Sequence, residues 1–201
     1  TVTGELLETL TASKTAVMDD YTAKDDVTYV LSLVNSGTAA LTGLTVADDL
    51  GAYLFDQGEA YPLVYNEGSI RYYVNGVLQT APEVTAGPPL VIRGISVPAG
   101  GNVLLIYETT VTNYAPLGLE ASITNRAVVT GGGLSSPVAA EETINMELRA
   151  DLSISKAVCP AVVTENGQLT YTFVIENTGS LAAGAADEAV LTDTFDPKLN
   201  P

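Results

Sequence analysis

Apolar and polar residues alternate along most of this chain, in short runs separated by turn residues. The run Val27–Val34 ends at Asn35-Ser36-Gly37, and Ser69–Val74 ends at Asn75-Gly76, a strong hairpin signal. A period of two is typical of half-buried strands and incompatible with a helical face. Further runs span 41–49, 77–79, 90–97, 102–112, 122–130 and 137–146, and 113–120 is expected to be loop. The pattern predicts an all-β fold, a β-sandwich, with no convincing helix.

The composition is compatible with this fold and excludes several functions. The 201 residues include 24 acidic and 8 basic ones, for a net charge of −16, yet 46% are apolar, which is enough for a core. This acidity argues against nucleic acid or anionic membranes as partners. The chain has no His and one Cys, which excludes a Ser-His-Asp triad, His-ligated zinc and an internal disulfide. We expect no cofactor and no turnover enzyme.

An internal repeat is the most informative feature of the sequence. Three pairs of segments share an offset of 142 positions: 11–14 with 153–156, 28–29 with 170–171, and 35–37 with 177–179. Beyond them the offset grows by three, so that 46–50 aligns with 191–195 and the extra residues fall in a loop at 182–186. The repeat predicts one module over 1–148 and the first third of a second over 149–201. A third of a sandwich is not expected to fold well alone, because its apolar face lacks an opposing sheet. The start at Thr1, without a signal peptide, suggests a piece of a longer protein, and no apolar run is long enough to span a membrane.

Four segments carry a resemblance to a known family: Asp151–Pro160, Gly167–Gly179, Leu191–Phe195 and Ile123–Val129. In this order they resemble the opening strand, the second strand and turn, the TDTLP segment and the closing NTATV strand of the DUF11 repeat of bacterial surface proteins. The resemblance implies Ig-like β-sandwiches, arranged in tandem on secreted or wall-anchored proteins at the bacterial cell surface. It implies a structural stalk or spacer whose partners are neighbouring repeats of the same chain. Related surface and pilin modules carry a spontaneous Lys–Asn isopeptide crosslink assisted by a buried Asp or Glu.

Three polar residues interrupt apolar, inward-facing rows of the predicted strands: Lys14, Asp48 and Asn125. Unpaired burial would be costly, so we expect them to be one another's partners. Burial lowers the pKa of a Lys, and a neutral Lys14 amine can attack the carboxamide of Asn125 while Asp48 acts as general acid and base. The order Lys, Asp, Asn resembles that of collagen-adhesin-like modules. We predict a single-turnover Lys14–Asn125 crosslink assisted by Asp48. The alternative is that Lys14 reaches solvent at a sheet edge beside Asp48 and that Asn125 caps a turn.

The same inward positions recur in the second module. Lys156 and Asp193 correspond to Lys14 and Asp48, but no Asn partner follows, so this second site is not expected to close. Asp49 is expected to point outward into solvent. Cys159 is expected to be a small core or edge residue, because no base is present to activate it.

Two further features leave other functions open. Four acidic residues between the first two strands form either a solvated turn or a Ca²⁺ site, and we predict no metal: Asp19, Asp20, Asp25 and Asp26. Five tyrosines either pack across strands or form a sugar-binding platform: Tyr53, Tyr61, Tyr65, Tyr72 and Tyr73. The platform would make the module an adhesin domain that binds a host protein, a glycan or a cell-wall ligand.

Overall fold

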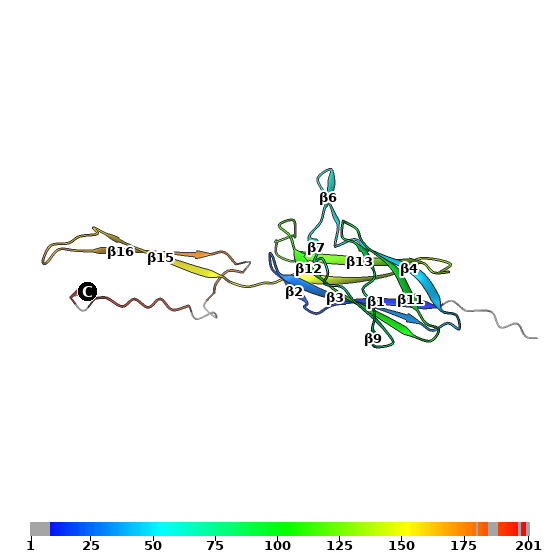
Figure 1. The fold of residues 1–201 in the computed structure, drawn as a ribbon. Helices are drawn as coiled ribbons and strands as arrows, with labels where there is room; N and C mark the ends of the chain where they lie inside the picture. Colours follow the sequence, from blue (N-terminus) through cyan, green and yellow to red (C-terminus); the bar gives the residue numbers. More distant parts are fainter. Residues whose placement is uncertain (1–8, 180, 185–188, 197, 200–201) are drawn as a thin grey trace, which may run out of the picture. The chain divides into compact units, whose positions relative to one another are not determined.

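The chain forms an all-β structure that divides into two compact units, Thr1–Glu147 and Leu148–Pro201. Figure 1 shows the computed structural model, which describes residues 9–179, 181–184, 189–196 and 198–199. Within these ranges there is no helix, and hence none able to cross a membrane. The described residues form sixteen strands: β1 (Leu10–Ala16), β2 (Asp20–Tyr21), β3 (Asp26–Asn35), β4 (Leu41–Asp48), β5 (Tyr53–Phe55), β6 (Gly58–Ala60), β7 (Leu63–Tyr65), β8 (Arg71–Val74), β9 (Val77–Leu78), β10 (Glu83–Thr85), β11 (Leu90–Val97), β12 (Asn102–Val111), β13 (Ser122–Gly131), β14 (Val138–Met146), β15 (Leu152–Cys159) and β16 (Thr170–Asn177).

The first unit is an Ig-like β-sandwich of two sheets. One sheet has the order β1-β3-β12-β8-β9, with β7 also paired to β12, and the other has the order β10-β11-β4-β13-β14-β2. Along the chain, β1, β3, β7–β9 and β12 belong to the first sheet, and β2, β4, β10, β11, β13 and β14 to the second, so that the chain crosses between the sheets several times. Strands distant in sequence therefore lie side by side, and β4 lies between β11 and β13. A separate β5–β6 hairpin projects from the sandwich (Figure 1).

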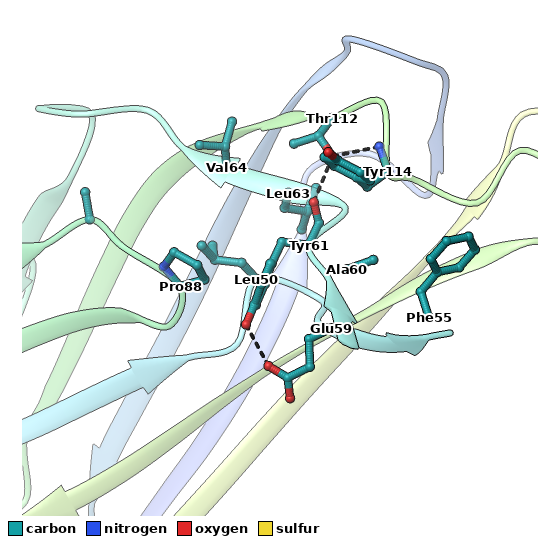
Figure 2. A pocket seen from close by; sticks show the side chains of 11 residues that line it. Leu50, Phe55, Glu59, Ala60, Tyr61, Leu63, Val64, Pro88, Thr112 and Tyr114 are labelled. Atoms are coloured by element: carbon teal, nitrogen blue, oxygen red, sulfur yellow. Dashed lines mark hydrogen bonds between the residues drawn. The ribbon is translucent and has the colours of Figure 1, made fainter. Parts of the chain in front are cut away.

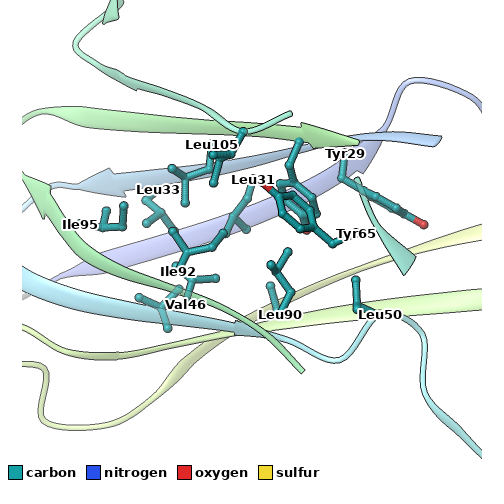
Figure 3. Close-up of a cluster of buried hydrophobic side chains, with 14 of the residues drawn as sticks. Tyr29, Leu31, Leu33, Val46, Leu50, Tyr65, Leu90, Ile92, Ile95 and Leu105 are labelled. Carbon is teal, nitrogen blue, oxygen red and sulfur yellow. The ribbon is translucent and has the colours of Figure 1, made fainter. Parts of the chain in front are cut away.

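The core lies between the two sheets and follows the alternation of the sequence. β3 buries Tyr29, Leu31 and Leu33, and the facing sheet contributes Val46 and Ile92 (Figure 3). Each strand contributes every second side chain because successive residues of a strand point to opposite faces. The expected all-β sandwich is confirmed.

The hairpin expected at Asn75-Gly76 is also confirmed, since both residues have positive φ, as a tight two-residue turn between β8 and β9 requires. The short strands β2, β5, β6, β7 and β10 were not predicted. Each has only two or three residues, too few to show a periodicity.

The described part of the second unit contains one hairpin, and its register repeats that of the first unit. Leu10 pairs with Asn35 and Lys14 with Leu31, and the pairs 142 positions later, Leu152 with Asn177 and Lys156 with Phe173, recur in β15–β16. The turns also match, because the side chain of Asn35 accepts the N–H of Gly37 at 3.0 Å just as that of Asn177 accepts the N–H of Gly179 at 3.0 Å.

Leu191–Phe195 was expected to match the end of β4, but it forms no strand. In the first unit that segment is held by β11 on one side and β13 on the other, and the described part of the second unit contains neither counterpart. Apolar side chains of the hairpin are accordingly exposed, with Ile154 at 53% and Ile175 at 57%. The loop insertion predicted at 182–186 lies partly outside the described residues, because only 182–184 of it belong to them.

Candidate functional site

Lys14 of β1 points into the core and makes a buried ion pair with Asp48. Its Nζ lies 2.5 Å from Asp48 Oδ2, and neither side chain has exposed surface. The amine also lies 4.8 Å from the ring centroid of Tyr29 and 6.0 Å from that of Tyr107. The alternative in which Lys14 reaches solvent at a sheet edge is therefore wrong. β1 places the residue on the inward row because Lys14 pairs with Leu31 in the middle of β3.

Asp48, the last residue of β4, has its carboxylate fully engaged. Oδ2 accepts the Lys14 ammonium and also the hydroxyl of Tyr107, and Oδ1 accepts the backbone N–H of Leu50 at 3.0 Å. The contact with Tyr107 was missed by sequence reasoning. Tyr107 lies on the inward row of β12, among mostly apolar residues. The sequence therefore identifies it as a core aromatic residue but does not reveal which group its hydroxyl contacts.

Asn125 lies in the middle of β13 with no exposed surface and no hydrogen-bond partner for its side chain. Neither Oδ1 nor Nδ2 is satisfied by any described residue. Because Ala127 pairs with Asp48 and Asn125 lies two residues along on the same face, the amide is the diagonal neighbour of the carboxylate. An unsatisfied buried amide is costly, by about 1–3 kcal/mol for each group. The alternative in which Asn125 caps a turn is wrong, since both of its neighbours in β13 pair with β14.

Burial sets the protonation of the groups around this ion pair. It lowers the pKa of the Lys14 amine, and the nearby carboxylate of Asp48 opposes this shift in part. It raises the pKa of the Tyr107 hydroxyl well above its ordinary value, so that this group stays protonated. Loss of the Lys14 proton is therefore easier here than in water, as a nucleophilic amine requires.

Asp49 was expected to point outward into solvent, and its side chain is partly exposed but also bonded to the backbone. It does point away from the core, but its Oδ1 accepts the backbone N–H groups of Gly51 and Arg126, both at 2.9 Å. Its own N–H donates to the carbonyl of Arg126 at 3.0 Å. These bonds form because Asp side chains readily accept from backbone donors near turns. They tie the end of β4 to β13 at the residue that follows Asn125.

The second unit holds the counterpart pair in a more open setting. Lys156 Nζ lies 2.6 Å from Asp193 Oδ1 and 2.8 Å from its Oδ2, as the repeat predicted, but the two side chains are 37% and 20% exposed. Aromatic rings surround the amine here as well, with Tyr171 at 4.4 Å and Phe195 at 5.6 Å from their centroids. Tyr171 lies 142 positions after Tyr29, so the repeat also covers the aromatic wall of the site.

The remaining candidate residues have other surroundings. Asp25 accepts the N–H of Thr22 at 2.7 Å and Asp26 the hydroxyl of Thr110 at 2.5 Å. In the described ranges no three His, Cys, Asp or Glu side chains are grouped to hold a metal. Cys159 was expected in a core or at an edge; it is exposed at the end of β15, an edge strand that no second sheet covers in the described part of the chain.

The five tyrosines fall into two groups. Tyr65 and Tyr72 are buried, as packing across strands predicted, whereas the other three are partly exposed: Tyr53, Tyr61 and Tyr73.

A surface groove of about 470 Å³ lies beside the β5–β6 hairpin (Figure 2). Its lining is largely apolar and includes Phe55 and Tyr114, which are 64% and 66% exposed. Tyr61 also lines it and donates its hydroxyl to Glu59 at 2.6 Å. Sequence reasoning missed Phe55 and Tyr114 here, because it considered neither as part of an aromatic cluster.

No protein-family model and no curated protein matches this sequence. Among solved structures, the pilus backbone of Streptococcus pneumoniae is similar at 14% identity and a TM-score of 0.48, over 61% of this chain and 31% of that chain. The collagen-binding domain of a Staphylococcus aureus adhesin is similar at 15% identity and a TM-score of 0.41, over 67% and 96%. The major pilin subunit of Bacillus cereus is similar at 11% identity and a TM-score of 0.45, over 85% and 56%. This chain thus spans about a third of the pneumococcal chain. With these low identities and scores, a functional proposal has to rest on the buried site.

Proposed function

We propose that the chain is a structural stalk module of a bacterial surface protein, closed by a self-formed isopeptide bond between Lys14 and Asn125. The observation that carries this proposal is the buried Lys14–Asp48 ion pair beside a buried, unpartnered Asn125 amide. An ordinary core would not retain such an arrangement, because an unsatisfied amide and a buried ion pair both cost stability against apolar residues of the same size. Bond formation removes the buried charges and leaves one neutral amide in place of the amine and the carboxamide.

The reaction begins with a proton transfer inside the ion pair. The Lys14 ammonium gives one proton to Asp48 Oδ2, which leaves a neutral amine and a neutral carboxylic acid. The amine attacks Cγ of Asn125 and forms the new N–C bond. Asp48 gives its proton to Nδ2, the Cγ–Nδ2 bond breaks, and ammonia departs. The second proton lost from Nζ returns to Asp48, so that one proton stays on the acid and all atoms balance.

The bond would join strands that lie in different sheets and far apart in the sequence. It ties β1 to β13 and closes a loop of about 110 residues, which by analogy with disulfides removes about 5 kcal/mol of conformational freedom from the unfolded chain. Under tension along the chain, the load would pass through the covalent bond, and the residues between 14 and 125 would stay folded. This behaviour suits a spacer that presents a distal region and resists proteolysis.

The wider setting of the module belongs to the same proposal. The matching register of β1–β3 and β15–β16 supports tandem repeats of the DUF11 type over 1–148 and 149–201, the second incomplete. The partners of the module are then neighbouring repeats, and its location is extracellular, at the bacterial cell surface or wall. Its chemistry is one self-crosslinking event and not turnover.

Peptide mapping tests the bond. Protease digestion of the folded and then denatured chain should release a branched peptide that joins the segment around Lys14 to the segment around Asn125, lighter by one ammonia than the sum of its parts. Lys14→Arg should abolish the branched peptide, and Lys24→Arg, at an exposed Lys, should leave it intact. Recovery of two separate linear peptides from folded wild-type chain would refute the proposed bond.

The groove beside the β5–β6 hairpin favours a second candidate function, that of an adhesin domain for a glycan or a host protein. Exposed aromatic rings such as Phe55 and Tyr114 provide the stacking faces that sugars use. Binding of the intact chain on a glycan array, lost in Phe55→Ala and kept in Val17→Ala at an exposed residue outside the groove, would support it. A blank array would remove the glycan version of this candidate.

A further inference from the structure

The site contains a third unsatisfied polar group besides the two atoms of the Asn125 amide. The hydroxyl of Tyr29 is buried, and no described residue makes a hydrogen bond to it. It is close to the amide N–H of Asn125, which opposes the rise in its pKa caused by burial, so that donation to Oδ1 needs a rotation of the amide about its Cβ–Cγ bond. The contact falls short of hydrogen-bond geometry, since Oδ1, Nδ2 and the hydroxyl are all without a partner. Three orphaned polar atoms in one place are rare in a folded core, and each calls for an explanation.

The position of Tyr29 relates it to both reacting groups. Its ring stacks against Tyr107 with centroids 6.0 Å apart, and its face lies 4.8 Å from the Lys14 amine. The hydroxyl of Tyr107 already has a partner, because it donates a hydrogen bond to the Asp48 carboxylate that pairs with Lys14. Tyr29 thus differs from Tyr107. Its hydroxyl has no assigned partner, and it lies beside the Asn125 amide, which also has none.

We propose that Tyr29 is a catalytic residue of the crosslinking reaction, whose hydroxyl donates a hydrogen bond to Asn125 Oδ1 when negative charge develops there. This inference rests on the proposed function. As the Lys14 amine adds to Cγ, the electron pair of the C=O bond moves to Oδ1, and a fixed donor stabilises that charge strongly in a buried site of low dielectric constant. When the Cγ–Nδ2 bond breaks, the electron pair returns and the carbonyl reforms. Tyr29 keeps its proton throughout, and the proton transfers remain with Asp48.

Two features of the site fit a donor and not a base. Burial raises the pKa of Tyr29, so its hydroxyl stays protonated while the amine reacts. The contact between the Tyr29 hydroxyl and Asn125 is weak before the reaction, as expected for a catalytic donor. A donor increases the rate only if its hydrogen bond is stronger in the transition state than in the ground state.

The test is the rate of ammonia loss in the full chain. Wild type and variants are isolated unfolded in guanidinium from inclusion bodies, refolded by dilution, quenched at intervals, and weighed by intact mass spectrometry. Tyr29→Phe should slow the reaction about 100-fold or more, the effect of removing one donor to an oxyanion. The matched control is Tyr72→Phe, which removes another buried hydroxyl, one that bonds the backbone of Ser96, and it should react at the wild-type rate.

Stability separates catalysis from a purely structural role. In an Asn125→Leu background, where no bond can form, adding Tyr29→Phe should leave the unfolding midpoint unchanged or higher, because the hydroxyl it removes has no partner. A slow Tyr29→Phe reaction with a lowered midpoint in this background would make the residue structural and overturn the inference. A wild-type rate in Tyr29→Phe would also overturn the inference about Tyr29, but it would leave the proposed function intact. A wild-type chain that folds without losing ammonia would overturn the proposed function itself.

Discussion

Replacing Asn125 with Leu should change stability in opposite directions depending on whether the bond exists. Leu has the same number of side-chain heavy atoms in the same branching, so the substitution leaves no cavity. Without a bond, wild type buries an amide that no described residue satisfies, and an apolar replacement of this shape is neutral or stabilising. With a bond, Asn125→Leu opens a loop of about 110 residues and lowers the free energy of unfolding by about 5 kcal/mol.

Urea unfolding followed by tyrosine fluorescence measures this difference in the first unit, which contains all of the tyrosines except Tyr171. With a dependence of about 2 kcal/mol per molar urea, a loss of 5 kcal/mol moves the midpoint down by about 2–3 M. Asn113→Leu, at an exposed Asn, is the matched control and should stay within about 0.5 kcal/mol of wild type. A midpoint for Asn125→Leu equal to or above that of wild type would contradict the reasoning.

Three further predictions follow from the site and its supports. Asp48→Asn should keep the full sequence mass, because the proton acceptor is lost, and should cost more than the about 5 kcal/mol of the opened loop in urea unfolding, because Lys14 also stays buried without its countercharge. Burial raises the pKa of Tyr21 to about 12, so its stabilising contribution is complete below the ordinary value of 10.0 and is lost as pH rises through 12; alkaline unfolding curves should show this loss in wild type and a smaller one in Tyr21→Phe. Gly51→Ala should cost about 2–5 kcal/mol, because Gly51 has a φ of +72° and a Cβ would lie 2.6 Å from Ile123 Cγ2, and an unchanged thermal midpoint would refute this.

Alternation in the sequence was enough to predict the sandwich and the inward position of its polar residues. Lys14, Asp48 and Asn125 each fall on a row whose neighbours are apolar, and period two assigns such residues to the core without knowledge of strand order. The pairing of Lys14 with Asp48 could be predicted because an unpaired buried charge costs free energy. Two opposite charges on the inward rows of one small core have few other partners.

The parts that sequence reasoning missed depend on pairings between distant strands. The hydroxyl of Tyr107 meets Asp48 across the two sheets, and nothing in β12 distinguishes this tyrosine from one that only packs. Asp49 was placed correctly outside the core, but its bonds to Arg126 require knowing that β4 lies beside β13. The same holds for 191–195, which aligns with the end of β4 in sequence but forms no strand, because the strands that flank β4 have no counterpart in the described second unit.

Intact mass of the denatured full chain tests the central claim most directly. Folded wild type, unfolded only for the measurement, should weigh less than its 201-residue sequence by one ammonia. The deficit should vanish in Lys14→Arg and in Asn125→Leu, and it should persist in Lys156→Arg, because the second unit has the Lys–Asp pair without an Asn at the matching position. A wild-type mass equal to that of the sequence, in protein shown to be folded, would contradict the account.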